Sequence, residues 1–232
     1  AMASKAMQDK AELAESACRE FVELGLSQTL GISNLEHAPV TISDVEIGLP
    51  GDVVSTIADR DDIDLIVMGT RKQHGTFDRL FGSVSSAVIR KANCPVWVVP
   101  EEAEFSNISS IVLASNLLET DPFHILQVAE MMETFEPVLR CVHVEKTEKG
   151  KTEMRMSDMM QVFEERIPSV DISFHQIATE GSVVEELDRI SQEVKADLLV
   201  MFRSHKNFIE RIVRPSLTRQ MLFHTHLPML VL

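Results

Sequence analysis

Residues 64–99 read DLIVMGTRKQHGTFDRLFGSVSSAVIRKANCPVWVV, and this stretch returns in altered form as DLLVMFRSHKNFIERIVRPSLTRQMLFHTHLPMLVL over residues 197–232. Every position of the second stretch lies 133 residues after its counterpart in the first. Three matched pairs show the offset: Asp64 with Asp197, Ser83 with Ser216, and Pro95 with Pro228. A repeat of this length predicts two copies of one structural unit within the chain.

The two copies differ in their glycines. Gly69 and Gly82 frame the loop of the first copy, whereas Phe202 and Pro215 stand at the matching positions of the second. Glycine lets the backbone approach a ligand closely, and N–H groups at the start of a helix favour an anion. Proline has no N–H to offer to a phosphate. We therefore predict a phosphate-binding loop in the first copy and a structural role for the second. The alternative is that Ser83 only caps a helix and the glycines only form turns.

Hydrophobic periodicity predicts an alternation of helices and strands. In the first half we expect helices over residues 5–26 and 83–91, a third helix opening at Gly51-Asp52, and strands over residues 40–47, 64–68 and 96–99. In the second half we expect strands over residues 111–114, 138–144 and 172–177 and helices over 122–135 and 153–166, followed by the repeated stretch. The apolar run at 64–68 is typical of a strand buried on both faces. Such alternation predicts a parallel sheet with right-handed crossovers.

The charged connector at residues 101–104 is the expected boundary between two domains, residues 1–104 and 105–232. A strand–helix–strand unit precedes the long helix of the second half, but the first half has no equivalent of that unit before its own long helix. The first domain is therefore expected to be incomplete at its N-terminal side.

Composition bounds the class of protein. The formal net charge of −14 argues against nucleic-acid partners, which require a basic surface. No apolar run reaches the roughly 20 residues that cross a membrane, so no membrane partner is expected. The three cysteines are widely spaced and form no CxxC pair, which is typical of thiols in a reducing cytoplasm.

Four consecutive features of the first half resemble the universal stress protein family. They are the strand DLIVMG at residues 64–69, the loop ending in Gly82-Ser83-Val84, the helix after it and the strand CPVWVV at residues 94–99. The likeness extends over nearly all of both halves, so the chain resembles a tandem member. The resemblance implies two tandem α/β units, each a doubly wound parallel five-stranded sheet of order 3-2-1-4-5, the first copy lacking its N-terminal strands. In the nucleotide-binding branch of the family, ATP lies at the carboxyl ends of strands 1 and 4.

The family loop G-x2-G-x9-G-[ST] maps onto this sequence from Gly69 to Gly82-Ser83, with Lys72 in place of the second glycine. A lysine at a position of positive φ costs roughly 1–2 kcal/mol. In the second half, Asn116 takes the place of the family's nucleoside-contacting aspartate. The resemblance implies that ATP or AMP is held by these residues: Gly69, Thr70, Arg71, Lys72, Gly82, Ser83 and Val84.

Three functions follow as alternatives. The first is a cytoplasmic, nucleotide-responsive stress regulator acting through its first domain. The second is an interaction module that binds no nucleotide. The third is a slow ATP hydrolase. It ranks last because the sequence has no GxSxG, HExxH, Walker or Cys-His signature that would supply catalytic groups. His224 and His226 have no third candidate ligand nearby in sequence, so we expect no metal site.

The last strands of the two halves, residues 96–99 and 229–232, are expected to pair with each other, either in a homodimer or as a pseudo-dimer within the chain. Strands 3 and 4 of the implied sheet are separated by strands 2 and 1, a gap on the order of 10–15 Å. We therefore expect an N-terminal segment outside this sequence, or another chain, to supply the missing strands.

Overall fold

The structure is a computed structural model that describes residues 2–30, 40–70, 83–104, 107–118, 120–146, 156–166, 171–203 and 217–232. The chain divides into two compact units, Ala1–Val53 and Val54–Leu232. In chain order the described elements are α1 (Met2–Leu30), α2 (Pro50–Ala58), β1 (Ile66–Thr70), α3 (Ser83–Lys91), β2 (Val96–Pro100), β3 (Ser110–Ala114), α4 (Asp121–Met131), η1 (Glu133–Phe135), β4 (Val138–Lys146), α5 (Met156–Arg166), β5 (Ile172–Thr179), α6 (Val183–Glu193), β6 (Leu198–Met201), α8 (Leu217–His224) and β7 (Met229–Val231). None of the helices within these ranges is both long and apolar enough to span a bilayer.

The first unit contains α1, which confirms the predicted helix and extends it at both ends. The strand predicted over residues 40–47 is wrong: this segment has no regular structure, and Val40 and Ile42 are 94% and 89% exposed. In the second half, the segment that corresponds to residues 40–47 is β5, which precedes α6 and pairs with β4. The described first half has no counterpart of β4, and a strand does not form without a neighbour for its N–H and C=O groups.

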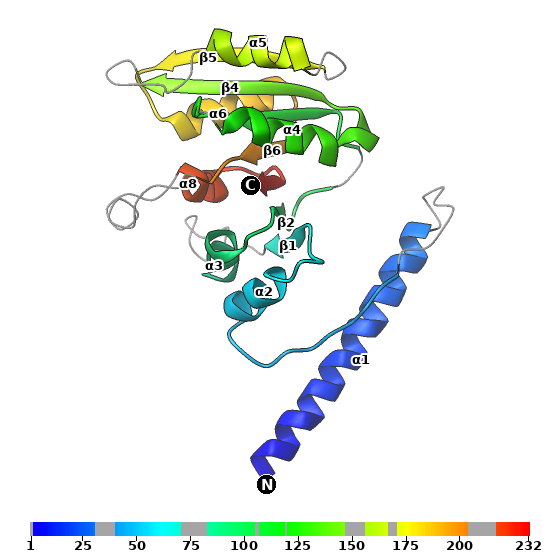
Figure 1. Cartoon of the computed structure of the whole chain (residues 1–232). Coiled ribbons are helices and arrows are strands. Elements are labelled where there is room, and N and C mark those ends of the chain that lie inside the picture. The colour runs from blue at the N-terminus through cyan, green and yellow to red at the C-terminus, as the bar shows by residue number, and fades with distance from the viewer. Residues whose placement is uncertain are drawn as a thin grey trace. The chain divides into compact units, whose positions relative to one another are not determined.

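The second unit contains a seven-stranded sheet of order β1-β2-β7-β6-β3-β4-β5. All neighbouring strands are parallel except β2 and β7, which are antiparallel. β4 and β5 are the longest strands and run side by side (Figure 1). The strands β5-β4-β3-β6-β7 reproduce the expected order 3-2-1-4-5 for the second half, whereas the described first half contributes only β1 and β2.

The two halves therefore share one sheet, which their last strands join. β2 and β7 are the last strands of the two halves, and they pair within the chain as predicted, with Val96 opposite Val231 and Val98 opposite Met229. All four of these side chains are fully buried. The pairing protects an edge of each half from solvent and from other chains.

Apolar cores cover both faces of the sheet because side chains alternate along each strand. On β3, Val112 and Ala114 belong to a core built with α3, α6 and α8, whereas Ile111 and Leu113 belong to a core built with α4 and α5. The helices thus lie on both faces, which is the doubly wound α/β arrangement.

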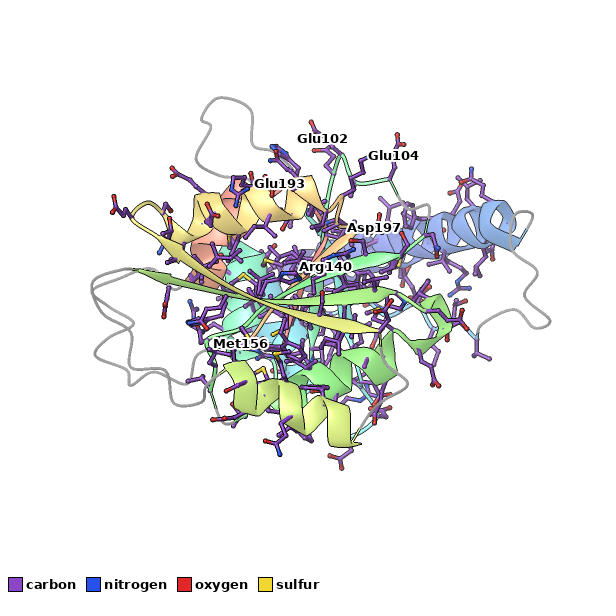
Figure 2. The ribbon with its side chains drawn as sticks, turned by 90° about the horizontal axis from the view of Figure 1, so that it is seen from above. Glu102, Glu104, Arg140, Met156, Glu193 and Asp197 are labelled. Atoms are coloured by element: carbon purple, nitrogen blue, oxygen red, sulfur yellow. The ribbon has the colours of Figure 1, made fainter. Side chains whose placement is uncertain are left out.

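A polar cluster fixes the amino ends of the central strands. The Asp197 carboxylate accepts hydrogen bonds from the N–H groups of Ser109 and Ser110 and from the Ser109 hydroxyl, each at 2.9 Å. Arg140 donates to the Ser110 hydroxyl at 3.0 Å, so both Arg140 and Asp197, labelled in Figure 2, contact the start of β3. Asp197 therefore ties β6 to the start of its neighbour β3.

Arg203, which follows β6, connects the second half to the first. Its guanidinium donates to the carbonyl oxygen of Cys94 at 2.6 Å and to that of Ala92, just after α3. Burial lowers the pKa of the Arg203 guanidinium. Both carbonyls belong to the segment that follows the carboxyl end of α3, where a positive charge is favoured.

Candidate functional site

The carboxyl end of β1 holds the first two predicted site residues. Gly69 and Thr70 are the last residues of this strand and pair with Val99 and Pro100 of β2. A Cβ built on Gly69 would meet no atom within 4 Å, so the space beside this backbone is open. Thr70 is buried, with 8% of its surface exposed. The end of β1 thus combines accessible backbone at Gly69 with the buried, hydroxyl-bearing residue Thr70.

The amino end of α3 holds the last two predicted site residues, Ser83 and Val84. Val84 packs partly buried against the core, and Ser85 and Val88 are buried behind it. The first turn of α3 carries no acidic residue, so the partial positive charge of the helix end is not neutralised there. Because β1, α3 and β2 form a parallel crossover unit, this helix end lies at the same sheet edge as the end of β1.

Arg71, Lys72 and Gly82 lie outside the described residues, so their part in a phosphate loop stays a prediction. The described part of the predicted site consists of Gly69, Thr70, Ser83 and Val84, at the ends of two elements that face one edge of the sheet.

The matching edge of the second half is filled with side chains. Phe202, the counterpart of Gly69, is 6% exposed, and its ring stacks on His124 with centroids 5.3 Å apart and an interplanar angle of 26°. An aromatic side chain therefore occupies the space that lies open beside Gly69. This packing supports the prediction that the second copy is structural.

A buried aspartate organises the turn after β3. Asp121 is 1% exposed, and its Oδ2 accepts from the Ser115 hydroxyl at 2.6 Å, the Asn116 N–H at 3.1 Å and the Leu118 N–H at 3.2 Å. Leu117 in this turn has φ 55°, a value that residues with a side chain seldom adopt. Asn116, which stands where the family has its nucleoside-contacting aspartate, is exposed.

Sequence reasoning missed Asp121 and its neighbours. The available signal was the Asp-Pro pair after a predicted strand, since acids and proline favour the first turn of a helix. His143 of β4 is also buried, and its Nδ1 lies 2.9 Å from the Ser115 carbonyl oxygen. Burial raises the pKa of the nearby Cys141 thiol to about 12. These groups form a compact internal cluster.

The sequence model of the Universal stress protein family matches residues 2–100 and again residues 118–232. Universal stress protein Slr1101 of Synechocystis sp. is 41% identical over 54 residues, 23% of this chain and 50% of the relative. Universal stress protein MJ0531 of Methanocaldococcus jannaschii is 44% identical over 52 residues, 22% of this chain and 31% of the relative. The chain thus spans half or less of the length of these curated relatives.

Solved structures share the fold. A universal stress protein from Archaeoglobus fulgidus DSM 4304 has a TM-score of 0.68 at 16% identity, covering 95% of this chain and 77% of that chain. A functionally unknown protein from Pseudomonas aeruginosa PAO1 has a TM-score of 0.64 at 14% identity, covering 94% and 77%. With a doubly wound parallel sheet and two family matches that together cover most of its length, the chain belongs to the universal stress protein family as a tandem member.

Proposed function

We propose that this chain is a stress-response regulator that binds ATP or AMP through the first half and uses the second half as a structural platform. The proposed ligand contacts are Gly69, Thr70, Arg71, Lys72, Gly82, Ser83 and Val84. The nucleotide phosphates lie at the amino end of α3, and the backbone at Gly69 lets the ligand approach.

The contrast between Gly69 and Phe202 carries the proposal. The two residues hold the same place in the repeat, yet the space at Gly69 is open and the space at Phe202 is filled by its own ring against His124. Ligands of open α/β sheets bind at the carboxyl ends of the strands, so an open end favours binding and a filled end opposes it.

The charge around the loop supports an anionic ligand. Arg71 and Lys72 follow directly after β1 in the sequence, and the first turn of α3 has no acid to repel a phosphate. Main-chain N–H groups and the dipole at a helix start favour anions.

Isothermal titration calorimetry of the full chain with ATP and with AMP tests this function. We expect Gly69→Phe, which copies the second half into the first, to weaken binding by at least about tenfold, or 1.4 kcal/mol. Gly69 is exposed on β1, so the variant is expected to fold. Phe202→Leu is the matched control and should leave the affinity unchanged. The proposal fails if wild-type protein binds neither nucleotide, or if only the Phe202 variant alters binding.

An interaction module is the second candidate, and the open edge of β1 favours it. Nucleotide carried through native purification would argue against a pure interaction module. A phosphate-release assay with ATP distinguishes a regulator from a slow hydrolase, and we expect no turnover above the rate without protein.

We further propose a cytoplasmic location. Cys18, Cys94 and Cys141 are free thiols, in keeping with a reducing compartment. A homodimer in addition to the internal β2–β7 pairing stays a prediction, which light scattering tests.

A further inference from the structure

The strand β5 forms one outer edge of the sheet. It pairs with β4 and, within the described residues, with no other strand. Its eight residues, ISFHQIAT, include no charged residue and no proline, and these are the features by which edge strands commonly resist pairing with another chain. The whole chain nevertheless carries a formal net charge of −14. A long, uncharged edge on a strongly acidic protein is therefore suited to pairing with a further strand.

The backbone of β5 presents a row of hydrogen-bonding groups to this edge. The Asp171 carbonyl oxygen accepts from the Leu139 N–H of β4. Since the N–H and C=O groups of successive residues point to opposite sides of a strand, those of Ser173 and His175 also face β4. The residues between them turn their backbone groups outward; these are Ile172, Phe174, Gln176 and Ala178.

An apolar flank of α5 lies above the same edge, since α5 packs on β5 (Figure 1). Met159 and Phe163 are buried toward the sheet. Met160 follows Met159 and Val162 precedes Phe163, so Met160 and Val162 project from opposite flanks of α5. Val162 is half-buried, in keeping with the neighbouring α4, whereas Met160 is 40% exposed on the flank above the open edge. The edge therefore combines outward backbone groups with uncovered apolar surface.

A second copy of this chain fits the edge because the edge is complementary to itself. In an antiparallel pairing centred on His175, Ile172 lies opposite Ala178 and Phe174 lies opposite Gln176. Each outward residue of one strand then meets an outward residue of the other. No charged residue of β5 stands opposite another, which favours the meeting of two chains that each carry a net charge of −14.

Two further observations favour a second copy over an unrelated strand. The Phe163 ring lies 5.5 Å from that of Phe174, and α5 runs opposite to β5, so Met160, one turn before Phe163, lies close to the level of His175. A two-fold axis through His175 therefore brings the Met160 side chains of two copies together. The pairing of β2 with β7 shows that this sheet already continues through an antiparallel contact between two end strands.

We propose that two copies of this chain associate through β5, in an antiparallel pairing centred on His175, with α5 of one copy packed on α5 of the other. The same surface of each copy forms the contact, as in a two-fold dimer, and the sheet continues from one copy into the next. This contact uses neither the last strands of the halves nor the residues proposed to bind a nucleotide. The proposal and the proposed function can therefore fail separately.

Sedimentation velocity of the full chain over a range of concentrations tests the association. We expect a monomer–dimer equilibrium that strengthens as NaCl is raised, because salt screens the repulsion between two acidic chains. Met160→Glu places two like charges near the axis and should raise the dissociation constant at least about tenfold. Gln161→Glu, the matched control, adds the same charge at the next, exposed position of α5 and should change the constant less than about twofold.

Gln176→Pro tests the backbone part of the contact. It removes an outward N–H and should raise the dissociation constant at least about tenfold, because proline is tolerated at a sheet edge but cannot donate to a new neighbour. Gln176→Val keeps the N–H and should dimerise at least as well as the wild type. Circular dichroism confirms that each variant is folded.

Cysteine cross-linking tests the register, in a Cys18→Ser background because Cys18 is the half-exposed thiol. The two copies of His175 form a non-hydrogen-bonded pair with Cα atoms about 4.5 Å apart, which a disulfide can bridge. His175→Cys should therefore give an intermolecular disulfide. Gln176→Cys is the control at the next exposed position, because its two copies lie diagonally, roughly 7–8 Å apart, and should not cross-link.

Three results would overturn the proposal. The first is a chain that stays monomeric up to about 0.5 mM at high salt. The second is a dimer whose dissociation constant is unchanged in Met160→Glu or in Gln176→Pro, since another surface would then join the copies. The third is cross-linking of Gln176→Cys as fast as that of His175→Cys, since the strands would then not pair about His175.

Discussion

Asp121 is the residue whose loss should damage the second half most. Its buried carboxylate accepts three hydrogen bonds around the turn after β3. Asp121→Ala leaves these donors without an acceptor, and we expect the free energy of unfolding to fall by about 3 kcal/mol. Asp121→Asn keeps one oxygen acceptor and should cost roughly half as much. Urea denaturation measures both, and a loss below about 0.5 kcal/mol for the alanine variant would contradict the assignment.

Cys141 should be the least reactive thiol. Burial raises its pKa from 9.0 to about 12, so the folded state disfavours the thiolate, which is the reactive form. Iodoacetamide at pH 8 should label the half-exposed Cys18 in the native protein and Cys141 only after unfolding. Equal native labelling rates, measured by mass spectrometry, would be inconsistent with this environment.

The same shift predicts a pH dependence of stability. The unfolded chain releases the Cys141 proton near pH 9, whereas the folded chain holds it until about pH 12. Above pH 9 the unfolded state therefore binds fewer protons, and the free energy of unfolding falls as the pH rises toward 12. The contribution is fully present below pH 9. Cys141→Val should reduce this alkaline loss of stability in urea titrations, while Cys18→Val should leave it unchanged.

At the level of elements, the β2–β7 pairing is the decisive contact between the halves. Val98 of β2 is fully buried opposite Met229, so we expect Val98→Ala to lower the free energy of unfolding by about 2 kcal/mol. Val67→Ala is a matched change in the neighbouring strand, where the side chain is 62% exposed, and should cost no more than about 0.5 kcal/mol. Equal effects in thermal or urea unfolding would mean that the pairing does not stabilise the fold.

Sequence patterns predicted helices and strands well where the chain itself contains the strands and helices that they pair or pack with. The helix over Ser83–Lys91 was predicted to the residue, and the strands of the second half agree to within one or two residues. The segment 40–47 has the alternation of a strand but no strand structure, because local pattern does not reveal whether a pairing partner exists. For the same reason, the strand expected to be buried on both faces is an edge strand with Val67 exposed.

The candidate site was partly predictable for a similar reason. Glycine and helix-start signals are local, so the loop pattern placed Gly69 near a strand end and Ser83 and Val84 at a helix start, as the structure has them, while their binding of a nucleotide stays a prediction. The stacking of Phe202 on His124 joins residues far apart in the sequence, and a local sequence pattern cannot predict such a contact. Whether the predicted residues bind a nucleotide depends on that kind of long-range packing.

At the scale of the whole molecule, the two halves of the sheet should unfold together. One core contains side chains from both halves, including Val88 and Val96 of the first and Met221 and Met229 of the second. Unfolding one half therefore exposes apolar surface of the other. We expect Trp97 fluorescence in β2 and pulsed alkylation of Cys141 in β4 to give the same urea midpoint. Midpoints that differ by more than about 0.5 M would show that the halves unfold separately.

Arg203 shows what covalent fusion allows. In a symmetric dimer of identical chains, every substitution enters the interface twice, on both sides of the axis. Here the cation that reaches the carbonyls of Ala92 and Cys94 occurs on one side, while the matching position in the other copy is Thr70. Within one chain the two copies can therefore differ at this position: Arg203 of the second copy contacts the first copy, whereas Thr70 of the first copy ends β1 next to the open space at Gly69.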